Sequence, residues 1–268
     1  ETLQESSYHS RQRPQRRSRH TGRPEDLLGL RMLRHVGHRG GGRREYGRRH
    51  GGSPRPGRVR HGADALRTDD IGADAVKIGM LHSSELIRAV RDTLERYAIR
   101  NVVLDPVMVA TSGDKLLQDE AVETLRTELI PACGSSPPNI PEAEILLGHK
   151  IDRQEELPEL AEALSCGGTV SVLLKAGHLE DEELVDVFYN AEKKSTLLLR
   201  SKRLQTRNTH GTGCTLSSAV AAFLARGLEL DDAVSRAKTY IDTAIRKGAD
   251  YEIGHGHGPV HHFHDFWE

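Results

Sequence analysis

From Leu66 onward the chain alternates short apolar runs with amphipathic stretches, and this alternation constrains the fold more than any other feature. The apolar runs predict strands at 75–81, 101–105 and 170–175, and a hairpin formed by 184–189 and 196–200. The amphipathic stretches predict helices at 84–97, 120–130, 157–164, 215–225 and 231–247. Such alternation predicts an α/β fold with a mainly parallel sheet that helices cover on both faces.

Three of these strands end in residues that can take part in chemistry. Asp105 follows the run NVVL, Lys175 follows VSVLL, and Met80 follows VKIG. Ligands of α/β sheets bind at the carboxyl ends of the strands, so these side chains are candidates for one shared site. Each of them, taken alone, is equally compatible with a solvated residue at the rim of the sheet.

The segment NTHGTGC at 208–214 precedes the predicted helix 215–225. Gly211, Thr212 and Gly213 let the backbone turn its N–H groups toward an anion, and the helix dipole adds to the attraction. Cys214 lies where a helix N-terminus lowers a thiol pKa, which predicts a base or nucleophile. A small buried apolar residue at a helix start is the alternative interpretation of Cys214.

Asn139 and Glu142 begin another predicted helix, in the segment NIPEAE. An Asn and a Glu three residues apart can both face a hydrated Mg²⁺ that also binds substrate phosphates. A capping box explains the same spacing without a metal. The sequence alone leaves both interpretations open.

The first part of the chain has a different composition. Residues 1–66 contain sixteen arginines, no lysine and six acidic residues, a net charge of +10, whereas the remaining 22 basic and 33 acidic residues give −11. Without apolar periodicity, residues 1–64 are expected to be disordered. A nucleic-acid-binding tail and a targeting peptide are possible explanations. We favour an out-of-frame translation of GC-rich coding sequence, which yields Arg, Gly, Pro and His without Lys.

Seven segments together resemble one enzyme family. In chain order they are VKIGML, NVVLDPVMVATSGDKLL, PNIPEAEILLG, VLLKAGH, NTHGTGCTLSSAVAAFLARG, AKTYI and GHGHGPVHHF. They resemble the hydroxymethylpyrimidine and phosphomethylpyrimidine kinases of thiamine biosynthesis, over about residues 66–266. The resemblance implies a ribokinase-like three-layer domain at 65–268, incomplete at its N-terminus. It also implies ATP-dependent phosphorylation of 4-amino-5-hydroxymethyl-2-methylpyrimidine and of its monophosphate.

The resemblance also assigns roles to individual residues. Gly211, Thr212 and Gly213 match an anion hole that stabilises the transferred phosphoryl group. Cys214 stands where sugar kinases carry an aspartate base; a thiolate accepts the hydroxyl proton there, or the hydroxyl attacks without a strong base. Asn139 and Glu142 match a motif that orients Mg²⁺ through water. ATP contacts are implied for Asp105, Lys175 and Thr209, and a pyrimidine contact for Met80.

Two departures from the family pattern predict weak or no activity. Nothing in residues 1–64 matches the family's glycine-rich segment GSDSGGGAG, which begins the pyrimidine pocket. The segment CGSSPP at 133–138 replaces an apolar central strand. The resemblance further implies a homodimer with small-molecule substrates and no membrane or nucleic-acid partner. Three cysteines without a paired framework suggest a cytoplasmic protein.

Three other functions remain open at this point. One is a pyridoxal kinase, and another is a non-catalytic remnant of the kinase fold. The third is a metal-binding module in the C-terminal tail, which contains several histidines: His255, His257, His261, His262 and His264. The tail resembles the family's own C-terminal segment, so we prefer the kinase interpretation.

Overall fold

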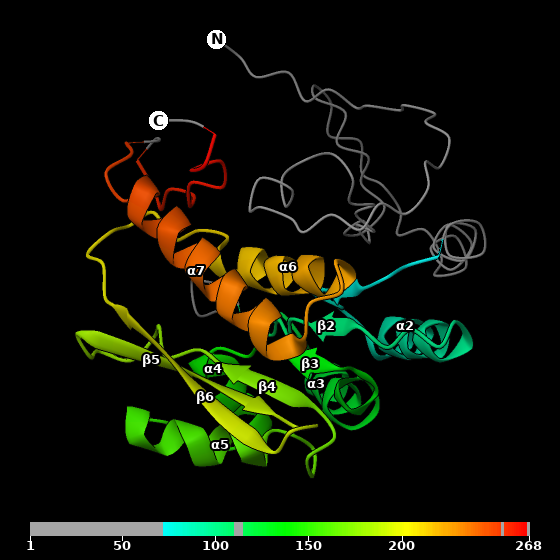
Figure 1. The fold of residues 1–268 in the computed structure, drawn as a ribbon. Coiled ribbons are helices and arrows are strands. Elements are labelled where there is room, and N and C mark those ends of the chain that lie inside the picture. The colour runs from blue at the N-terminus through cyan, green and yellow to red at the C-terminus, as the bar shows by residue number, and fades with distance from the viewer. Residues whose placement is uncertain (1–71, 110–114, 253–254, 267–268) are drawn as a thin grey trace, which may run out of the picture.

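A computed structural model describes residues 72–109, 115–252 and 255–266 (Figure 1). The expected domain boundary at residue 65 and the arginine-rich segment 1–64 lie outside the described residues. So do the residues ATSGD at 110–114, the second half of a motif on which the resemblance depends.

One six-stranded sheet forms the centre of the molecule, in the order β1-β2-β3-β4-β5-β6. The first four strands are parallel neighbours: β1 (Val76–Ile78), β2 (Val102–Leu104), β3 (Ser135–Ser136) and β4 (Ser171–Leu174). The hairpin β5 (Glu183–Asn190) and β6 (Ser195–Lys202) adds two antiparallel strands. The predictions of a mainly parallel sheet and of this hairpin are confirmed.

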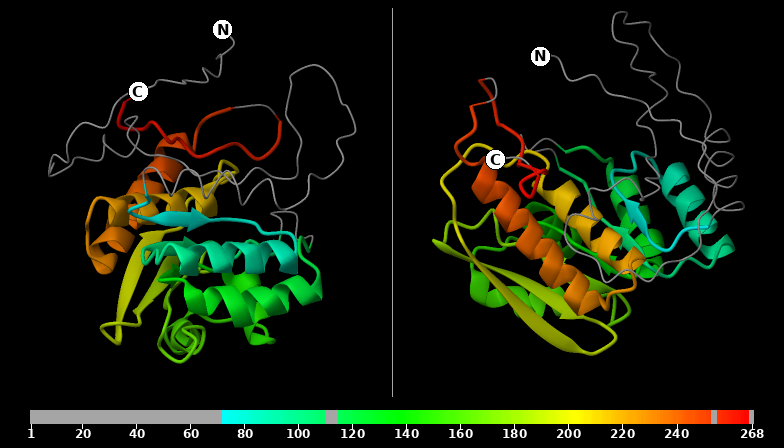
Figure 2. Two further views of the ribbon diagram at one scale, coloured as in Figure 1. Left: turned by 90° about the vertical axis from the view of Figure 1, so that its right-hand side faces the viewer. Right: turned by 45° about the horizontal axis from the view of Figure 1, so that its top comes forward.

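Helices cover both faces of this sheet, which makes three layers (Figures 1 and 2). The connections between the parallel strands lie on one face: α2 (Ser84–Arg96), α3 (Asp119–Thr124), α4 (Ile140–Leu147) and α5 (Leu157–Ala163). The opposite face carries α6 (Thr212–Ala225) and α7 (Leu230–Gly248). Within the described residues, no helix is long and apolar enough to cross a bilayer.

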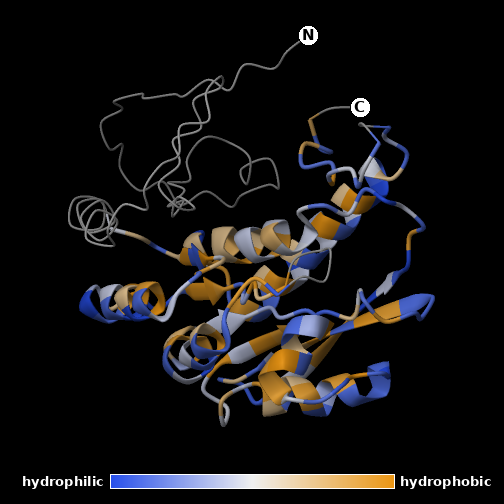
Figure 3. Cartoon of the chain, turned by 180° about the vertical axis from the view of Figure 1, so that it is seen from behind, coloured by the Kyte–Doolittle hydropathy of each residue, from blue (hydrophilic) through white to orange (hydrophobic). Residues whose placement is uncertain are grey.

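The central strands are buried on both faces because their alternate side chains enter different cores. Val103 belongs to the apolar cluster beneath α6 and α7, whereas Val102 and Leu104 belong to the cluster against α2 and α3. Figure 3 shows the hydrophobic residues concentrated on the strands and on the helix sides that face them. This double burial explains why the strands read as continuous apolar runs.

The helix predicted at 120–130 is shorter than expected. Regular α-helix ends at Thr124, and a π-helical turn over Leu125–Leu129 and a 3-10 turn over Ile130–Ala132 follow. Pro131 has no N–H to donate to the carbonyl of Thr127, and its ring crowds that carbonyl. The hydrogen bonds therefore shift register, as in the bond from Ile130 N to Leu125 O.

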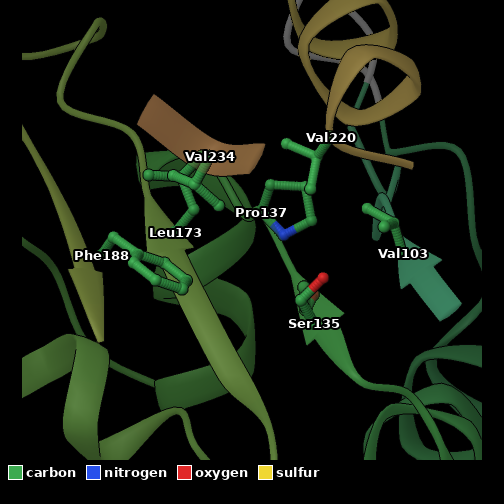
Figure 4. A pocket seen from close by; sticks show the side chains of 8 residues that line it. Val103, Ser135, Pro137, Leu173, Phe188, Val220 and Val234 are labelled. Carbon is green, nitrogen blue, oxygen red and sulfur yellow. The ribbon is translucent and has the colours of Figure 1, made fainter. Parts of the chain in front are cut away.

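The central strand β3 keeps its place but lacks apolar side chains. Ser135 pairs with Val103 on one side and with Ser171 on the other. A cavity of about 10 Å³ lies beside it, among apolar side chains of β2, β4, α6 and α7 (Figure 4). The Ser135 hydroxyl is buried there and has no hydrogen-bond partner among the described residues.

Candidate active site

The N-terminus of α6 presents unpaired backbone N–H groups. Gly211 caps the helix in the left-handed conformation, with φ of 88°, which a glycine adopts without strain. The bond from Thr215 N to Gly211 O (2.9 Å) starts the helical ladder. The N–H groups of Gly213 and Cys214 therefore have no helical partner, and they are free to bind an anion.

Asp105 lies below this helix terminus and is only 2% exposed. The Ser217 hydroxyl of α6 donates to its Oδ2 (3.1 Å). The Lys77 ammonium lies 3.3 Å from the same oxygen, and the Lys175 ammonium lies 3.9 Å from Oδ1. The structure thus brings the ends of β1, β2 and β4 together beneath α6, as the positions of Asp105 and Lys175 in the sequence indicated.

The third part of the site is the start of α4. Asn139 forms a β-bridge with Lys175, and the Lys175 ammonium donates to the Pro137 carbonyl. Asn139 Oδ1 accepts from Glu142 N, and Glu142 Oε2 accepts from Asn139 N, both at 2.9 Å. The capping box is therefore present, while the motif also lies against the lysine.

Glu142 differs from an ordinary capping residue in its burial. It is 2% exposed, and burial raises its pKa to about 7, although Lys175 and the Asn139 amide oppose this shift. Ordinary capping carboxylates lie at the surface and are fully charged. A carboxylate that titrates near neutrality beside a lysine changes its charge readily when a cation or a phosphate binds.

The prediction of a lowered pKa for Cys214 is wrong in direction. Cys214 is exposed at the surface, but partial desolvation by the surrounding side chains raises its thiol pKa, and Lys77 opposes this effect. The carboxylate of Asp105 raises it further. The nearby negative charge and the desolvation outweigh the helix dipole, so Cys214 is a neutral thiol at physiological pH.

Two other predicted residues lie at the margins of this cluster. Met80 follows the end of β1 by two residues and packs, partly buried, against the core on the α2 side. Thr209 is exposed, and its carbonyl accepts from the Thr212 hydroxyl at 2.7 Å. Thr209 therefore supports the turn that precedes α6.

Sequence reasoning assigned no role to Lys77, Ser217 or Asn208. Asn208 is buried, and its side-chain amide donates to the carbonyls of Gly248 and Tyr251, both at 2.7 Å. It thereby ties the loop before α6 to the end of α7. Lys77 lies in the segment VKIGML, between Val76 and Ile78. Because successive side chains of a strand point to opposite faces, this position indicated that Lys77 faces the other side of the sheet from these two residues.

The C-terminal tail supports the same loop. His210 forms a β-bridge with Pro259, and His261 is buried against the end of α7. The described residues contain no group of three His, Cys, Asp or Glu side chains placed to hold a metal ion.

A cleft of about 610 Å³ opens beside α4 and the loop after β4. Four acidic residues are among those that line it: Glu144, Asp152, Glu180 and Asp181. Their negative charge disfavours a polyphosphate. The two lysines and the α6 terminus, in contrast, present positive charge and open N–H groups.

A three-layer α/β sheet with a lysine–aspartate cluster below a glycine-rich helix terminus defines a small-molecule kinase of the ribokinase-like class. Residues 55–261 match the family model described as phosphomethylpyrimidine kinase. The chain belongs to this family. It is 48% identical over 200 residues to the hydroxymethylpyrimidine/phosphomethylpyrimidine kinase of Rhizobium meliloti (strain 1021), covering 74% of each chain.

Solved structures support the same assignment. A phosphomethylpyrimidine kinase from Clostridium difficile 630 superposes with a TM-score of 0.61 at 37% identity, covering 70% of this chain and 76% of that one. The ADP complex of Bacillus subtilis pyridoxal kinase gives a TM-score of 0.71 at 34% identity, covering 78% of each. The fold is therefore shared by phosphomethylpyrimidine kinases and pyridoxal kinases.

Proposed function

We propose that this chain transfers the γ-phosphoryl group of ATP to 4-amino-5-hydroxymethyl-2-methylpyrimidine and then to its monophosphate, in the cytoplasm, for thiamine biosynthesis. Membership of the phosphomethylpyrimidine kinase family supports the choice of substrate. The observation that carries the proposal is the buried Asp105, held between two ammonium groups beneath the open N–H groups of α6. Phosphoryl transfer is catalysed mainly by positioning and by stabilising charge, and this arrangement supplies both.

On the nucleotide side, Lys175 is the residue that binds the ATP phosphates. It is fixed by the Pro137 carbonyl and by the strand pairing with Asn139, so its ammonium is preorganised. Gly211, Thr212 and Gly213 form the turn that presents the open N–H groups at the start of α6, and these N–H groups stabilise the charge that develops on the transferred group. Thr209 and Asp105 complete this half of the site.

On the acceptor side, the raised pKa of Cys214 favours one of the two alternatives that the sequence left open. A neutral thiol is a poor base, so the substrate hydroxyl attacks without a strong base. Cys214 then contributes its backbone N–H and a small, polarisable side chain at the reacting end of the substrate. Met80 lines the pyrimidine pocket in this proposal.

The residues at the start of α4 fit a magnesium ion that is held largely by water and phosphate. Asp105 and Glu142 provide two buried carboxylates close to Lys175, and Mg²⁺ prefers one or two carboxylates together with waters. Bound there, the ion would neutralise charge on the ATP phosphates. Asn139 fixes the first turn of α4 and thereby the position of Glu142.

The test is ADP release by the purified chain with the hydroxymethylpyrimidine, its monophosphate and pyridoxal as separate acceptors. Turnover is expected with both pyrimidines, at a low rate because residues 1–64 lack the family's glycine-rich segment. Lys175→Met should lower kcat/KM at least roughly 100-fold, because a charge-assisted contact to phosphate is lost. Lys247→Met, an exposed change on α7, is the matched control. Release of ADP with pyridoxal alone would favour the second candidate, a pyridoxal kinase, to which the B. subtilis structure is similar.

A homodimer is the expected oligomeric state, and no contact with nucleic acid is expected. Sedimentation equilibrium tests the first expectation directly. A chain that stays monomeric at all concentrations would refute it.

A further inference from the structure

The buried Asp105 has more positive charge around it than one carboxylate requires. Lys77 approaches Oδ2 from β1, and Lys175 approaches Oδ1 from the residue after β4. Ser217 already donates a hydrogen bond to Oδ2. A structural ion pair needs one lysine, so the second ammonium calls for a separate explanation.

The two lysines face different parts of the site. Lys175 is bound to the Pro137 carbonyl near the start of α4, on the side assigned to ATP. The Lys77 ammonium lies over Gly79, 3.1 Å from where a Cβ would stand, and of the two lysines it has the larger electrostatic effect on the Cys214 thiol. Met80 is the next residue after Gly79. Lys77 therefore lies on the acceptor side of Asp105.

The charge balance also leaves room for an anion. The ammonium groups of Lys77 and Lys175 lie 3.3 and 3.9 Å from the one carboxylate of Asp105. One of these two positive charges is therefore not balanced within the ion-pair cluster. The Lys77 side chain is 20% exposed, so solvent reaches part of it.

We propose that Lys77 binds the phosphate that the acceptor already carries during the second transfer, and so determines that the monophosphate is a substrate. This inference rests on the proposed function. In that step an oxygen of the monophosphate forms a bond to the γ-phosphorus, the bond from this phosphorus to the bridging oxygen of ADP breaks, and ADP leaves with that electron pair. The attacking oxygen is already deprotonated, so the step needs no base but must overcome repulsion between two anions. A cation on the acceptor side offsets this repulsion.

Calorimetric titration of the full chain tests the assignment, with the hydroxymethylpyrimidine, its monophosphate and a non-hydrolysable ATP analogue as ligands. Lys77→Met should weaken monophosphate binding roughly 10- to 100-fold more than binding of the alcohol, the range expected for one charge-assisted hydrogen bond. Lys77→Arg should restore the preference for the monophosphate. Lys175→Met should instead weaken the ATP analogue, and Lys247→Met should change neither.

The possible failures are distinguishable. A wild-type chain that binds neither pyrimidine refutes the proposed function and this assignment with it. A wild-type chain that binds the monophosphate, with Lys77→Met binding it equally well, refutes the assignment alone. Equal weakening of the alcohol and the monophosphate also refutes it, because this is the result for a lysine that only supports Asp105.

A measurement on the wild-type chain covers the case in which Lys77→Met does not fold. Acylation of lysines can be followed residue by residue with mass spectrometry, without ligand and with each pyrimidine. The monophosphate should protect Lys77 more than the alcohol does, while Lys247 reacts equally in all samples. Equal protection of Lys77 by both pyrimidines would overturn the proposal.

Discussion

Replacing Ser135 with valine should stabilise this protein. Ser135 lies in the middle of the sheet, 5% exposed, on the face that α6 and α7 cover. Its hydroxyl finds no partner among the described residues, and the cavity beside it is lined by Val103, Leu173 and Val220 (Figure 4). A polar atom therefore stands where the surroundings favour a methyl group.

The size of the effect follows from three contributions. Removing a buried hydroxyl without a partner gains about 1–3 kcal/mol. One additional buried methyl group contributes about 0.8 kcal/mol more. Repacking around the second methyl group of valine takes back about 1 kcal/mol, because its neighbours must shift in a closely packed core. The free energy of unfolding of Ser135→Val should thus rise by about 1–3 kcal/mol.

Urea denaturation of four chains separates these contributions. Ser135→Thr has the shape of valine but keeps the hydroxyl, and Ser135→Ala removes the hydroxyl without filling the cavity. Valine should be the most stable, with alanine and threonine between it and wild type. If valine proves no more stable than threonine, the hydroxyl is satisfied by a water molecule in the cavity and the reasoning is refuted.

Three further predictions concern the site and its supports. The pKa of Glu142 is raised from 4.5 to about 7, so between these pH values the folded chain keeps a proton on Glu142 that the unfolded chain loses. The free energy of unfolding should therefore fall by about 3 kcal/mol as the pH rises through this range. Glu142→Gln should flatten the curve of stability against pH. A flat wild-type curve would contradict the burial of this charge. Asn208→Ala should lower the free energy of unfolding by about 1–3 kcal/mol in urea, because the carbonyls of Gly248 and Tyr251 lose their donor, and Asn208→Asp should not restore it since a carboxylate cannot donate. Cys214 should react with iodoacetamide more slowly than a free cysteine at pH 7.5, and more slowly still in Lys77→Met, as measured by mass spectrometry against Cys214→Ser; fast alkylation at neutral pH would show a lowered thiol pKa after all.

The sheet could be predicted from the sequence because its strands are buried on both faces. Continuous apolar runs such as NVVL, separated by amphipathic stretches, match few architectures besides a parallel sheet with two helical layers. The helix predicted at 120–130 was wrong in its last turns, since periodicity does not register the effect of Pro131 on hydrogen-bond register. Local pattern therefore identified the elements but not their irregular ends.

The site was only partly accessible to the same reasoning. The proximity of Asp105 and Lys175 could be predicted because each follows a strand, and strand ends meet at one edge of the sheet. Lys77 was missed because it stands inside β1, where a charged side chain is significant only once its partner across β2 and α6 is known. The predicted direction of the Cys214 pKa shift was wrong for the same reason. The helix terminus can be predicted from the sequence, whereas the nearby carboxylate of Asp105 is a tertiary contact.

In strand β3, backbone hydrogen bonds fix the position of the chain, whereas the serine side chains affect only how well the strand packs. Its backbone is paired on both sides, through Gly134 N to Val102 O (3.1 Å) and Ser171 N to Gly134 O (3.2 Å). Just beyond β3, Lys175 N donates to Pro138 O (3.1 Å). This bond continues the pairing with β4 up to the start of α4. None of these bonds uses a side chain, and the serines therefore leave Asn139 beside Lys175.

The serines of β3 should consequently lower the free energy of unfolding relative to apolar side chains, without changing the position of Lys175. Ser135→Val is expected to raise the free energy of unfolding while leaving the affinity for an ATP analogue unchanged, because the backbone already fixes Lys175. If turnover remains weak in Ser135→Val, its cause lies on the acceptor side of the site, where residues 1–64 lack the family's glycine-rich segment. A gain in nucleotide affinity in Ser135→Val would instead show that the packing of β3 and the position of Lys175 are coupled.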